Sequence, residues 1–145
     1  MTEQDLPAVM RIERALFPDD AWSENMLRGE LAEQPATRHY VVAYELEPHE
    51  EIVGYAGLCA VGDAGDVQTI GVRADRWGHG VGAALLTALI TEAAARGCTT
   101  VYLEVRADNE RAQKLYERFG FERIGVRKRY YQPSGVDAIV MTKGI

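Results

Sequence analysis

Hydrophobic residues near the start of the chain recur at helical spacing. The stripe consists of Leu6, Val9, Ile12 and Leu16. Thr2 and Asp5 precede it as a capping pair, and the sequence FPDD at 17–20 ends it, because proline and paired aspartates favour a turn. Ser23 is placed to cap a second short helix over residues 24–31. This part of the chain therefore predicts two helices.

The pattern then changes to that of strands. The runs HYVVAYEL (39–46) and IVGYAGLCAV (52–61) are rich in β-branched and aromatic residues. Because the turn sequence EPHEE separates them, they predict an antiparallel hairpin. A second turn, GDAGD (62–66), leads into a third strand, VQTIGV (67–72).

Strands and helices alternate in the second half of the chain. Residues 73–97 open with glycines and continue at helical spacing with Leu85, Leu86, Leu89 and Ile90, up to a favourable stop at Gly97. TTVYLEV (99–105) predicts a strand, and residues 108–120 predict a helix that Asp108 or Asn109 caps.

Two last strands are expected at 121–131 and 136–143, around the turn sequence QPSG. The succession of helices, antiparallel strands and strand–helix units predicts a mixed α/β domain without a linker.

The composition limits the class of protein. A chain of 145 residues with 47% hydrophobic and 26% charged residues predicts one soluble domain with room for a core. A net charge of −6 argues against a nucleic-acid binder that works through a basic face. The longest apolar run, VGAALLTALI, is about half the length that a membrane span needs. Cys59 and Cys98 have neither metal-ligand nor disulfide-framework spacing, so a cytoplasmic setting is expected.

The segment RWGHGVGAALL (76–86) brings glycines to the start of a predicted helix. Unpaired N–H groups and the helix dipole give such an end partial positive charge, and glycine lets a bulky anion approach the backbone. Gly78, Gly80 and Gly82 are therefore candidates to cradle phosphates. The alternative is an ordinary glycine-rich turn.

Gly78, Gly80 and Ala83 also match the literal fingerprint of a dinucleotide-binding fold, with Glu104 where a ribose-binding acid would lie. In that fold, however, the first glycine follows its strand almost directly, whereas residues 73–77 intervene here. Too little sequence follows to complete such a fold, and no Gly-Lys-Ser/Thr follows the loop. These features argue against a dinucleotide or Walker-type site.

Two polar side chains stand out near the end of the chain. Glu104 ends a strand of otherwise apolar and aromatic residues, and Tyr116 lies at helical spacing with Ala112 and Leu115. The pattern alone favours a solvated position for Glu104 and a core position for Tyr116. Asn109 suits a helix cap as well as it suits a ligand contact.

Three motifs together resemble the GNAT family of N-acetyltransferases. They are QTIGV (68–72), GHGVGAALL (78–86) and VYLEVRADNERAQKLYERFGFERIGVRKRYY (101–131). Within the family, the chain is most similar to the RimI type, which acetylates the N-terminal alanine of a small-subunit ribosomal protein. The resemblance implies a single N-acetyltransferase domain over residues 1–145, with a mixed, mostly antiparallel sheet flanked by helices and splayed at the acetyl-CoA site.

The resemblance also assigns a cofactor site to the splay, with acetyl-CoA as co-substrate and no metal. The backbone of one strand would bind the pantetheine, the glycine loop would hold the pyrophosphate, and one asparagine would contact the CoA. The residues so assigned are Ile70, Gly71 and Val72, then Gly78, His79, Gly80, Val81, Gly82 and Ala83, and finally Asn109.

By the same resemblance, Glu104 is the general base and Tyr116 the general acid of a direct transfer without a covalent enzyme intermediate. A free α-amino group has a pKa near 7.7–8.0, so about a tenth or more of it is neutral at pH 7, whereas lysine is almost all protonated. A modest base therefore suffices for an N-terminal substrate. The expected partner is the N-terminus of a ribosomal protein, and neither a nucleic acid nor a membrane.

Two features depart from the family pattern. Trp77 and Gly78 occupy places where members usually have Gln, Arg or another basic residue, and Arg76 or His79 is a candidate to compensate. Members also usually begin with a strand before the first helix. We therefore expect either a truncated start or the loss of an edge strand before residue 1.

The sequence leaves other functions open. A small-amine or lysine acetyltransferase would have the same fold and a different acceptor channel. A non-catalytic acyl-CoA-binding module would bind CoA without needing Glu104 or Tyr116. Tyr130 and Tyr131 either line the peptide channel or end a strand.

Overall fold

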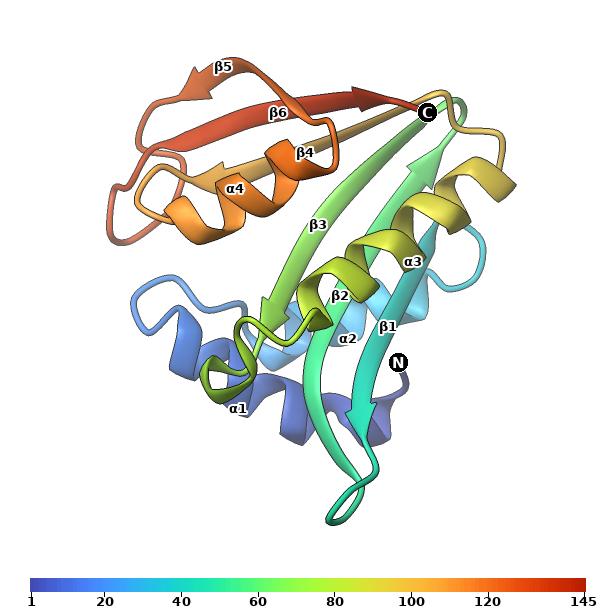
Figure 1. The fold of residues 1–145 in the computed structure, drawn as a ribbon, viewed down its shortest axis with the longest axis vertical. Coiled ribbons are helices and arrows are strands. Elements are labelled where there is room, and N and C mark those ends of the chain that lie inside the picture. The colour runs from blue at the N-terminus through green and yellow to red at the C-terminus, as the bar shows by residue number, and fades with distance from the viewer.

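The computed structural model describes residues 1–145, and Figure 1 shows the course of the chain. The helices are α1 (Leu6–Leu16), α2 (Glu24–Ala32), α3 (Val81–Ala95) and α4 (Glu110–Arg118), with short 3-10 turns at Glu3–Asp5 and Ala74–Arg76. The strands are β1 (Arg38–Glu45), β2 (Glu51–Val61), β3 (Ala64–Val72), β4 (Thr100–Arg106), β5 (Glu122–Arg127) and β6 (Ala138–Gly144).

All six strands join in one sheet, in the order β1-β2-β3-β4-β6-β5. β3 and β4 are its only parallel neighbours, and every other neighbouring pair is antiparallel. The predicted mixed, mostly antiparallel α/β fold is therefore confirmed.

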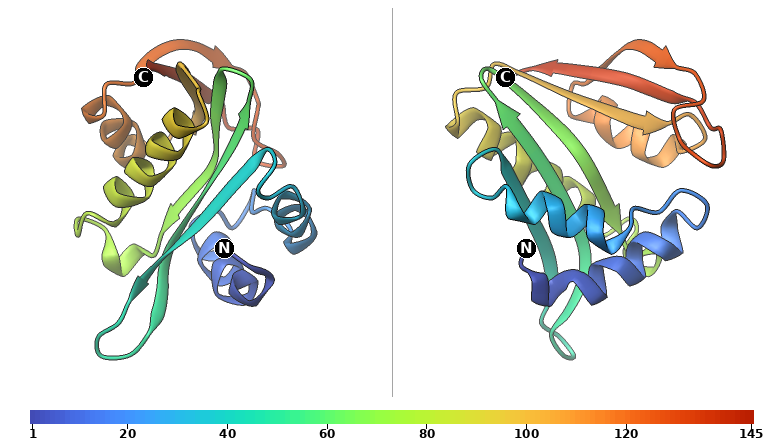
Figure 2. Two further views of the ribbon diagram at one scale, coloured as in Figure 1. Left: turned by 90° about the vertical axis from the view of Figure 1, so that its right-hand side faces the viewer. Right: turned by 180° about the vertical axis from the view of Figure 1, so that it is seen from behind.

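Helices cover both faces of the sheet. Figure 2 shows α1 and α2 on one face and α3 and α4 on the other. An apolar cluster joins the first two helices to the sheet and consists of Leu6, Val9, Met10, Ile12, Leu27, Tyr40 and Tyr55. The larger cluster on the opposite face includes Leu86 and Leu89 of α3 and Tyr116 of α4. None of the helices combines the length and the apolar character that crossing a membrane requires.

The predicted helix ends follow from local chemistry. Asn109 rather than Asp108 caps α4, because its side-chain oxygen accepts the Ala112 N–H at 3.2 Å. Gly97 and Gly120 stop α3 and α4 with left-handed φ angles of 86° and 91°.

Two segments differ from the sequence-based expectation. GDAGD is expected to turn as a whole, but β3 begins at Ala64, because Gly62 with its φ of 63° makes the turn early. β5 ends at Arg127, short of the expected end at 131. The backbone turns at Arg129 (φ 52°), whose N–H donates to Asp137 Oδ1 at 2.9 Å. A loop over 128–137 thus replaces the short predicted turn.

Two buried tyrosines lie across glycines of the neighbouring strand. Tyr40 of β1 is in register with Gly57 of β2, and Tyr55 of β2 is in register with Gly71 of β3. A Cβ atom would lie 2.2 Å from the Tyr40 ring at Gly57, and 2.6 Å from the Tyr55 ring at Gly71. Glycine is needed at both positions because the rings fill the space.

β3 and β4 pair over only part of their length. The parallel pairing joins Ala64 to Thr100 at one end and Val67 to Leu103 at the other. β3 continues to Val72 and β4 to Arg106, but no pairing joins these last parts. Figure 1 shows the two strands diverging beyond their paired part, and the gap between them is the predicted splay.

We expect Gly57→Ala to lower the free energy of unfolding by about 1–3 kcal/mol, because the Tyr40 ring must move to admit the methyl group. Gly29→Ala is the matched control, since Gly29 is exposed in α2 and nothing lies within 4 Å of its Cβ position. The control should gain up to about 1 kcal/mol from helix propensity. Urea unfolding curves measure both changes, and a Gly57→Ala variant as stable as the parent would contradict this packing.

Candidate active site

The gap between β3 and β4 opens into a cleft of about 360 Å³. Its walls come from β3, the loop before α3, α4 and the segment after α1. Residues of the wall include Ile70, Gly71, Val72, Trp77, Gly82, Asn109, Arg111 and Tyr116. Half of the residues predicted to bind the cofactor therefore meet here, although they come from three separate elements.

The edge of β3 presents free backbone groups to this cleft. The Arg73 N–H donates to the Val53 carbonyl of β2 at 2.8 Å, which fixes the register of the antiparallel ladder. In this register, Gly71 is a hydrogen-bonded position that faces β2, whereas the N–H and C=O groups of Ile70 and Val72 point toward the gap. Backbone contacts with a ligand are therefore available at Ile70 and Val72.

The glycine loop leads into α3 through two glycines with left-handed φ angles. Gly78 and Gly80 have left-handed φ angles of 81° and 82°, and Gly80 directly precedes α3. The Ala84 N–H donates to the Gly80 carbonyl at 3.0 Å, so the N–H groups before it lack helical acceptors. Gly82 lines the cleft, while the other predicted phosphate-binding residues lie outside its wall: Gly78, His79, Gly80, Val81 and Ala83.

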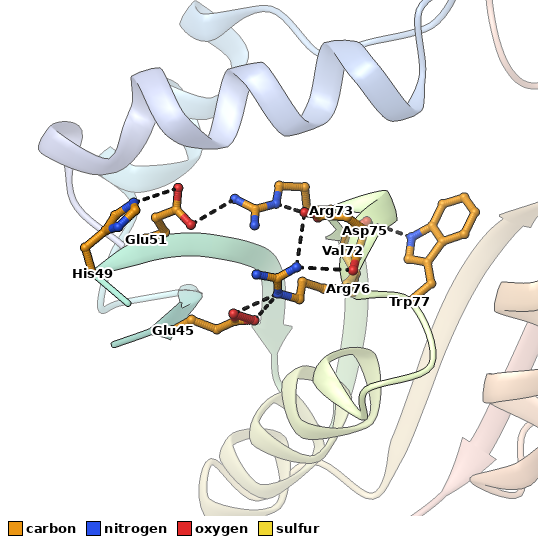
Figure 3. Close-up of polar contacts among 8 residues, drawn as sticks. All are labelled: Glu45, His49, Glu51, Val72, Arg73, Asp75, Arg76 and Trp77. Atoms are coloured by element: carbon orange, nitrogen blue, oxygen red, sulfur yellow. Dashed lines mark hydrogen bonds and ion pairs between the residues drawn. The ribbon is translucent and has the colours of Figure 1, made fainter. Parts of the chain in front are cut away.

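The arginines of this loop are engaged elsewhere, as Figure 3 shows. Arg73 pairs with Asp75 at 2.6 Å and with Glu51 at 3.6 Å. Arg76 pairs with Glu45 of β1 and, at 3.1 Å, with Asp75. These ion pairs fasten the loop to β1 and β2, so Arg76, a candidate to compensate for a missing phosphate contact, is already held by two carboxylates.

Trp77 connects the loop to both walls of the cleft. Its Nε1–H donates to the Val72 carbonyl at 2.8 Å, and Figure 3 shows its ring pointing away from the loop arginines. The Arg111 guanidinium of α4 packs over this ring, 3.6 Å from the centroid. The sequence marks Trp77 as a departure from the family pattern but predicts neither contact, because the partners lie on other elements.

A second, smaller cleft of about 110 Å³ adjoins the first. Glu104 lines only the smaller cleft, together with Tyr131 of the loop over 128–137. The wall common to both clefts is formed by Phe17, Ile70, Arg106, Asn109, Ala112 and Tyr116. The predicted base thus faces one cleft, and the predicted acid lies between the two.

Glu104 is half-buried where β4 leaves β3. Burial raises the pKa of its carboxyl group above the ordinary value, the Arg127 guanidinium 3.4 Å away partly offsets that rise, and Asp66 adds to it. A carboxylate with a raised pKa is a stronger base than an exposed one, so the site suits proton abstraction.

Glu13 is a second carboxyl group in the wall of the smaller cleft, which the sequence does not single out. It is buried, and it accepts hydrogen bonds from the Trp22 N–H at 3.0 Å and from the Tyr55 hydroxyl. Both oxygens of Glu13 accept hydrogen bonds within the protein, whereas Glu104 accepts none and has only the Arg127 ion pair.

Tyr116 belongs to the core and also reaches the wall between the clefts. Its ring packs edge-on against Phe121, with the centroids 5.9 Å apart. Burial raises the pKa of its hydroxyl well above the ordinary value, which keeps it protonated at neutral pH. The hydroxyl has no hydrogen-bond partner in the protein. Every fully buried side-chain N or O atom has such a partner, so the Tyr116 hydroxyl is not fully buried and is open to the clefts. The core position and the predicted role are therefore compatible.

Asp20 ties two distant segments together at the smaller cleft. Its carboxylate accepts hydrogen bonds from the Ser134 N–H at 3.1 Å and hydroxyl at 2.6 Å, and it also pairs with Arg106. The Arg106 guanidinium lies 5.3 Å from the centroid of the Tyr131 ring. No local pattern predicts this link, because Asp20 and Ser134 are 114 residues apart.

Comparison with known proteins gives the geometry its context. A sequence model of the acetyltransferase (GNAT) family matches residues 6–121. The N-alpha-acetyltransferase RimI of Mycobacterium tuberculosis is 40% identical, over 99% of this chain and 89% of that protein.

Solved structures agree with these matches. The ribosomal-protein-S18-alanine N-acetyltransferase from Escherichia coli has 32% identity and a TM-score of 0.81, over 100% of this chain and 90% of that one. Ard1 from Thermoplasma volcanium, at 23% identity, has the same fold, with a TM-score of 0.87 over 100% and 94% of the two chains.

These matches confirm that the chain resembles RimI-type enzymes. They also confirm the predicted activity class, an acetyl-CoA-dependent N-acetyltransferase. The family model covers most of the chain, including β3, the glycine loop and α4, which line the larger cleft. The chain therefore belongs to the acetyltransferase (GNAT) family.

Proposed function

We propose that this enzyme acetylates the N-terminal α-amino group of a ribosomal protein, with acetyl-CoA in the larger cleft and the amine in the smaller one. The observation that carries the proposal is the common wall of the two clefts, with Tyr116 in that wall and Glu104 on the acceptor side. The named activities of the relatives from Mycobacterium tuberculosis and Escherichia coli support the same acceptor class.

Acetyl-CoA would be bound chiefly by backbone groups. The N–H and C=O groups of Ile70 and the N–H of Val72 point into the gap and would pair with the amide groups of the pantetheine arm, whereas the Val72 carbonyl is already taken by the Trp77 Nε1–H. The pyrophosphate would lie at the glycine loop, where the unpaired N–H groups of the first turn of α3 favour an anion. Asn109, in the common wall, would contact the CoA between these ends.

The transfer would be direct. Glu104 takes a proton from the amine as its nitrogen forms a bond to the acetyl carbon. The Val72 N–H faces the gap and would stabilise the developing oxyanion. When the carbon–sulfur bond breaks, the thiolate leaves toward the larger cleft and receives a proton from Tyr116 in the common wall.

The smaller cleft favours the end of a chain with a small first residue. Its volume of about 110 Å³ lies well below the range of about 300–1,000 Å³ that is usual for drug-sized ligands. Asp20, which lines this cleft, is held by hydrogen bonds from Ser134, so the loop over 128–137 is fixed beside the proposed acceptor site. The small volume suits an N-terminal alanine, and the Escherichia coli relative is named as an enzyme that acts on the alanine of ribosomal protein S18.

A peptide assay tests this function directly. The protein is incubated with acetyl-CoA and a peptide that begins Ala-Arg and contains one lysine, with its N-terminus either free or blocked, and CoA release is measured. We expect release only with the free N-terminus. Equal release with both peptides would move the target to lysine, and no release with either would contradict an N-terminal acetyltransferase.

Glu104→Gln is the control that separates an enzyme from a binding module. It should lower turnover about a hundredfold or more, because the amide cannot take up the proton, while the affinity for CoA stays nearly unchanged. Unaltered turnover in this variant would remove Glu104 from the proposed mechanism.

The pH dependence gives a second prediction. Glu104 must be ionised to act, so kcat/KM falls as the pH drops through its raised pKa. Because Arg127 lowers that pKa, Arg127→Gln should move the acidic limb of the kcat/KM profile to higher pH, by about 0.2–0.7 units for an exposed pair.

Arg123→Gln is the matched control for this shift, since Arg123 lies on the same strand and pairs with Glu117 instead. Its acidic limb should coincide with that of the parent enzyme. An unmoved limb in Arg127→Gln, or an equal shift in the control, would show that Glu104 is not the titrating base.

A further inference from the structure

Arg111 is a cation without an anionic partner at the larger cleft. Arg73, Arg76 and Arg106 near this cleft are each paired with two carboxylates. Arg111 also lines the cleft, yet it forms neither an ion pair nor a hydrogen bond, and its guanidinium packs over the Trp77 ring. The one cation left free beside the cleft is therefore held by an aromatic face.

Trp77 is itself fixed in place. Its Nε1–H donates to the Val72 carbonyl at 2.8 Å, which anchors the indole to the end of β3. The Arg111 guanidinium lies 3.6 Å from the ring centroid, a stacked arrangement that orients the planar group and leaves its N–H edge open. The stack thus restricts the long Arg111 side chain before a ligand binds, so that binding costs less conformational entropy.

None of the carboxylates near the cleft pairs with Arg111. Asp108 lines the same cleft but pairs with Arg106 at 3.0 Å. Asp19 also lines the cleft, on the segment after α1, but it is exposed to solvent and does not pair with Arg111. Partial burial lowers the pKa of the Arg111 guanidinium somewhat, but an arginine stays charged at neutral pH.

We propose that Arg111, oriented by Trp77, pairs with a phosphate group of acetyl-CoA. This replaces the side-chain contact that the family pattern places in the glycine loop, where Trp77 and Gly78 now stand and where Arg76 is already paired. A guanidinium fork matches two phosphate oxygens at once, which suits a site whose other contacts are backbone N–H groups. The inference rests on the proposed function, because it takes acetyl-CoA to lie in the larger cleft.

Calorimetric titration with CoA, 3′-dephospho-CoA and pantetheine tests the pairing. Arg111→Gln should weaken CoA binding about 10- to 100-fold, as expected for the loss of a charge-assisted hydrogen bond, and should leave the weak binding of pantetheine unchanged. Arg118→Gln is the matched control, because Arg118 is exposed on the same helix and lies outside both clefts. It should bind CoA like the parent enzyme.

The dephospho ligand identifies the phosphate. An equal loss with CoA and 3′-dephospho-CoA supports pairing with the pyrophosphate, and a loss confined to CoA supports pairing with the 3′-phosphate. CoA binding by Arg111→Gln within about twofold of the parent, or an equal loss for pantetheine, would overturn the inference alone. Failure of the parent enzyme to bind CoA at all would overturn the proposed function with it.

A double-mutant cycle tests the part assigned to Trp77. Trp77→Ala should weaken CoA binding about 3- to 10-fold, and Trp77→Phe, which keeps a ring face, should weaken it less. In the Arg111→Gln background, Trp77→Ala should have no further effect, because it acts through the arginine. Additive losses in the double variant would overturn the positioning role.

Discussion

The early end of hydrogen bonding between β3 and β4 is the constraint on which the site depends. The strands pair from Ala64 and Thr100 to Val67 and Leu103, and beyond this point each continues without the other. A parallel pair that continued to Val72 would bury the edge groups of Ile70 and Val72 in a ladder and close both clefts. The parting exposes backbone groups on one side of the gap and Glu104 on the other.

Ion pairs hold the segments around the gap in place. Arg73 and Arg76 fasten the glycine loop to β1 and β2, and Asp20 fastens the loop over 128–137 to the segment after α1. These links lie between partly buried groups, and they fix geometry where the strand ladder is absent. Acetyl transfer between two bound molecules depends on such positioning.

Much of the fold could be predicted because its signals are local. Helix caps such as Asn109, stops such as Gly97 and the β-branched and aromatic runs of β1 and β2 depend on neighbours in sequence, and the structure agrees with each. The start of β3 and the end of β5 were misplaced because single residues, Gly62 and Arg129, set those turns.

Parts of the site could not be predicted for a different physical reason. Glu104 and Tyr116 lie within strong family motifs, so the resemblance singles them out, although their pattern alone favours a surface and a core position. The Trp77–Arg111 stack and the Asp20–Ser134 link join elements far apart in sequence, and only the docking of those elements creates them.

The most direct test of the gap as the cofactor site is amide hydrogen exchange, monitored by NMR with and without CoA. The Ile70 and Val72 amides should become about tenfold or more better protected, while the Gly71 amide, already facing β2, changes little. Unchanged exchange at Ile70 and Val72 in the CoA-bound protein would contradict a cofactor in the gap.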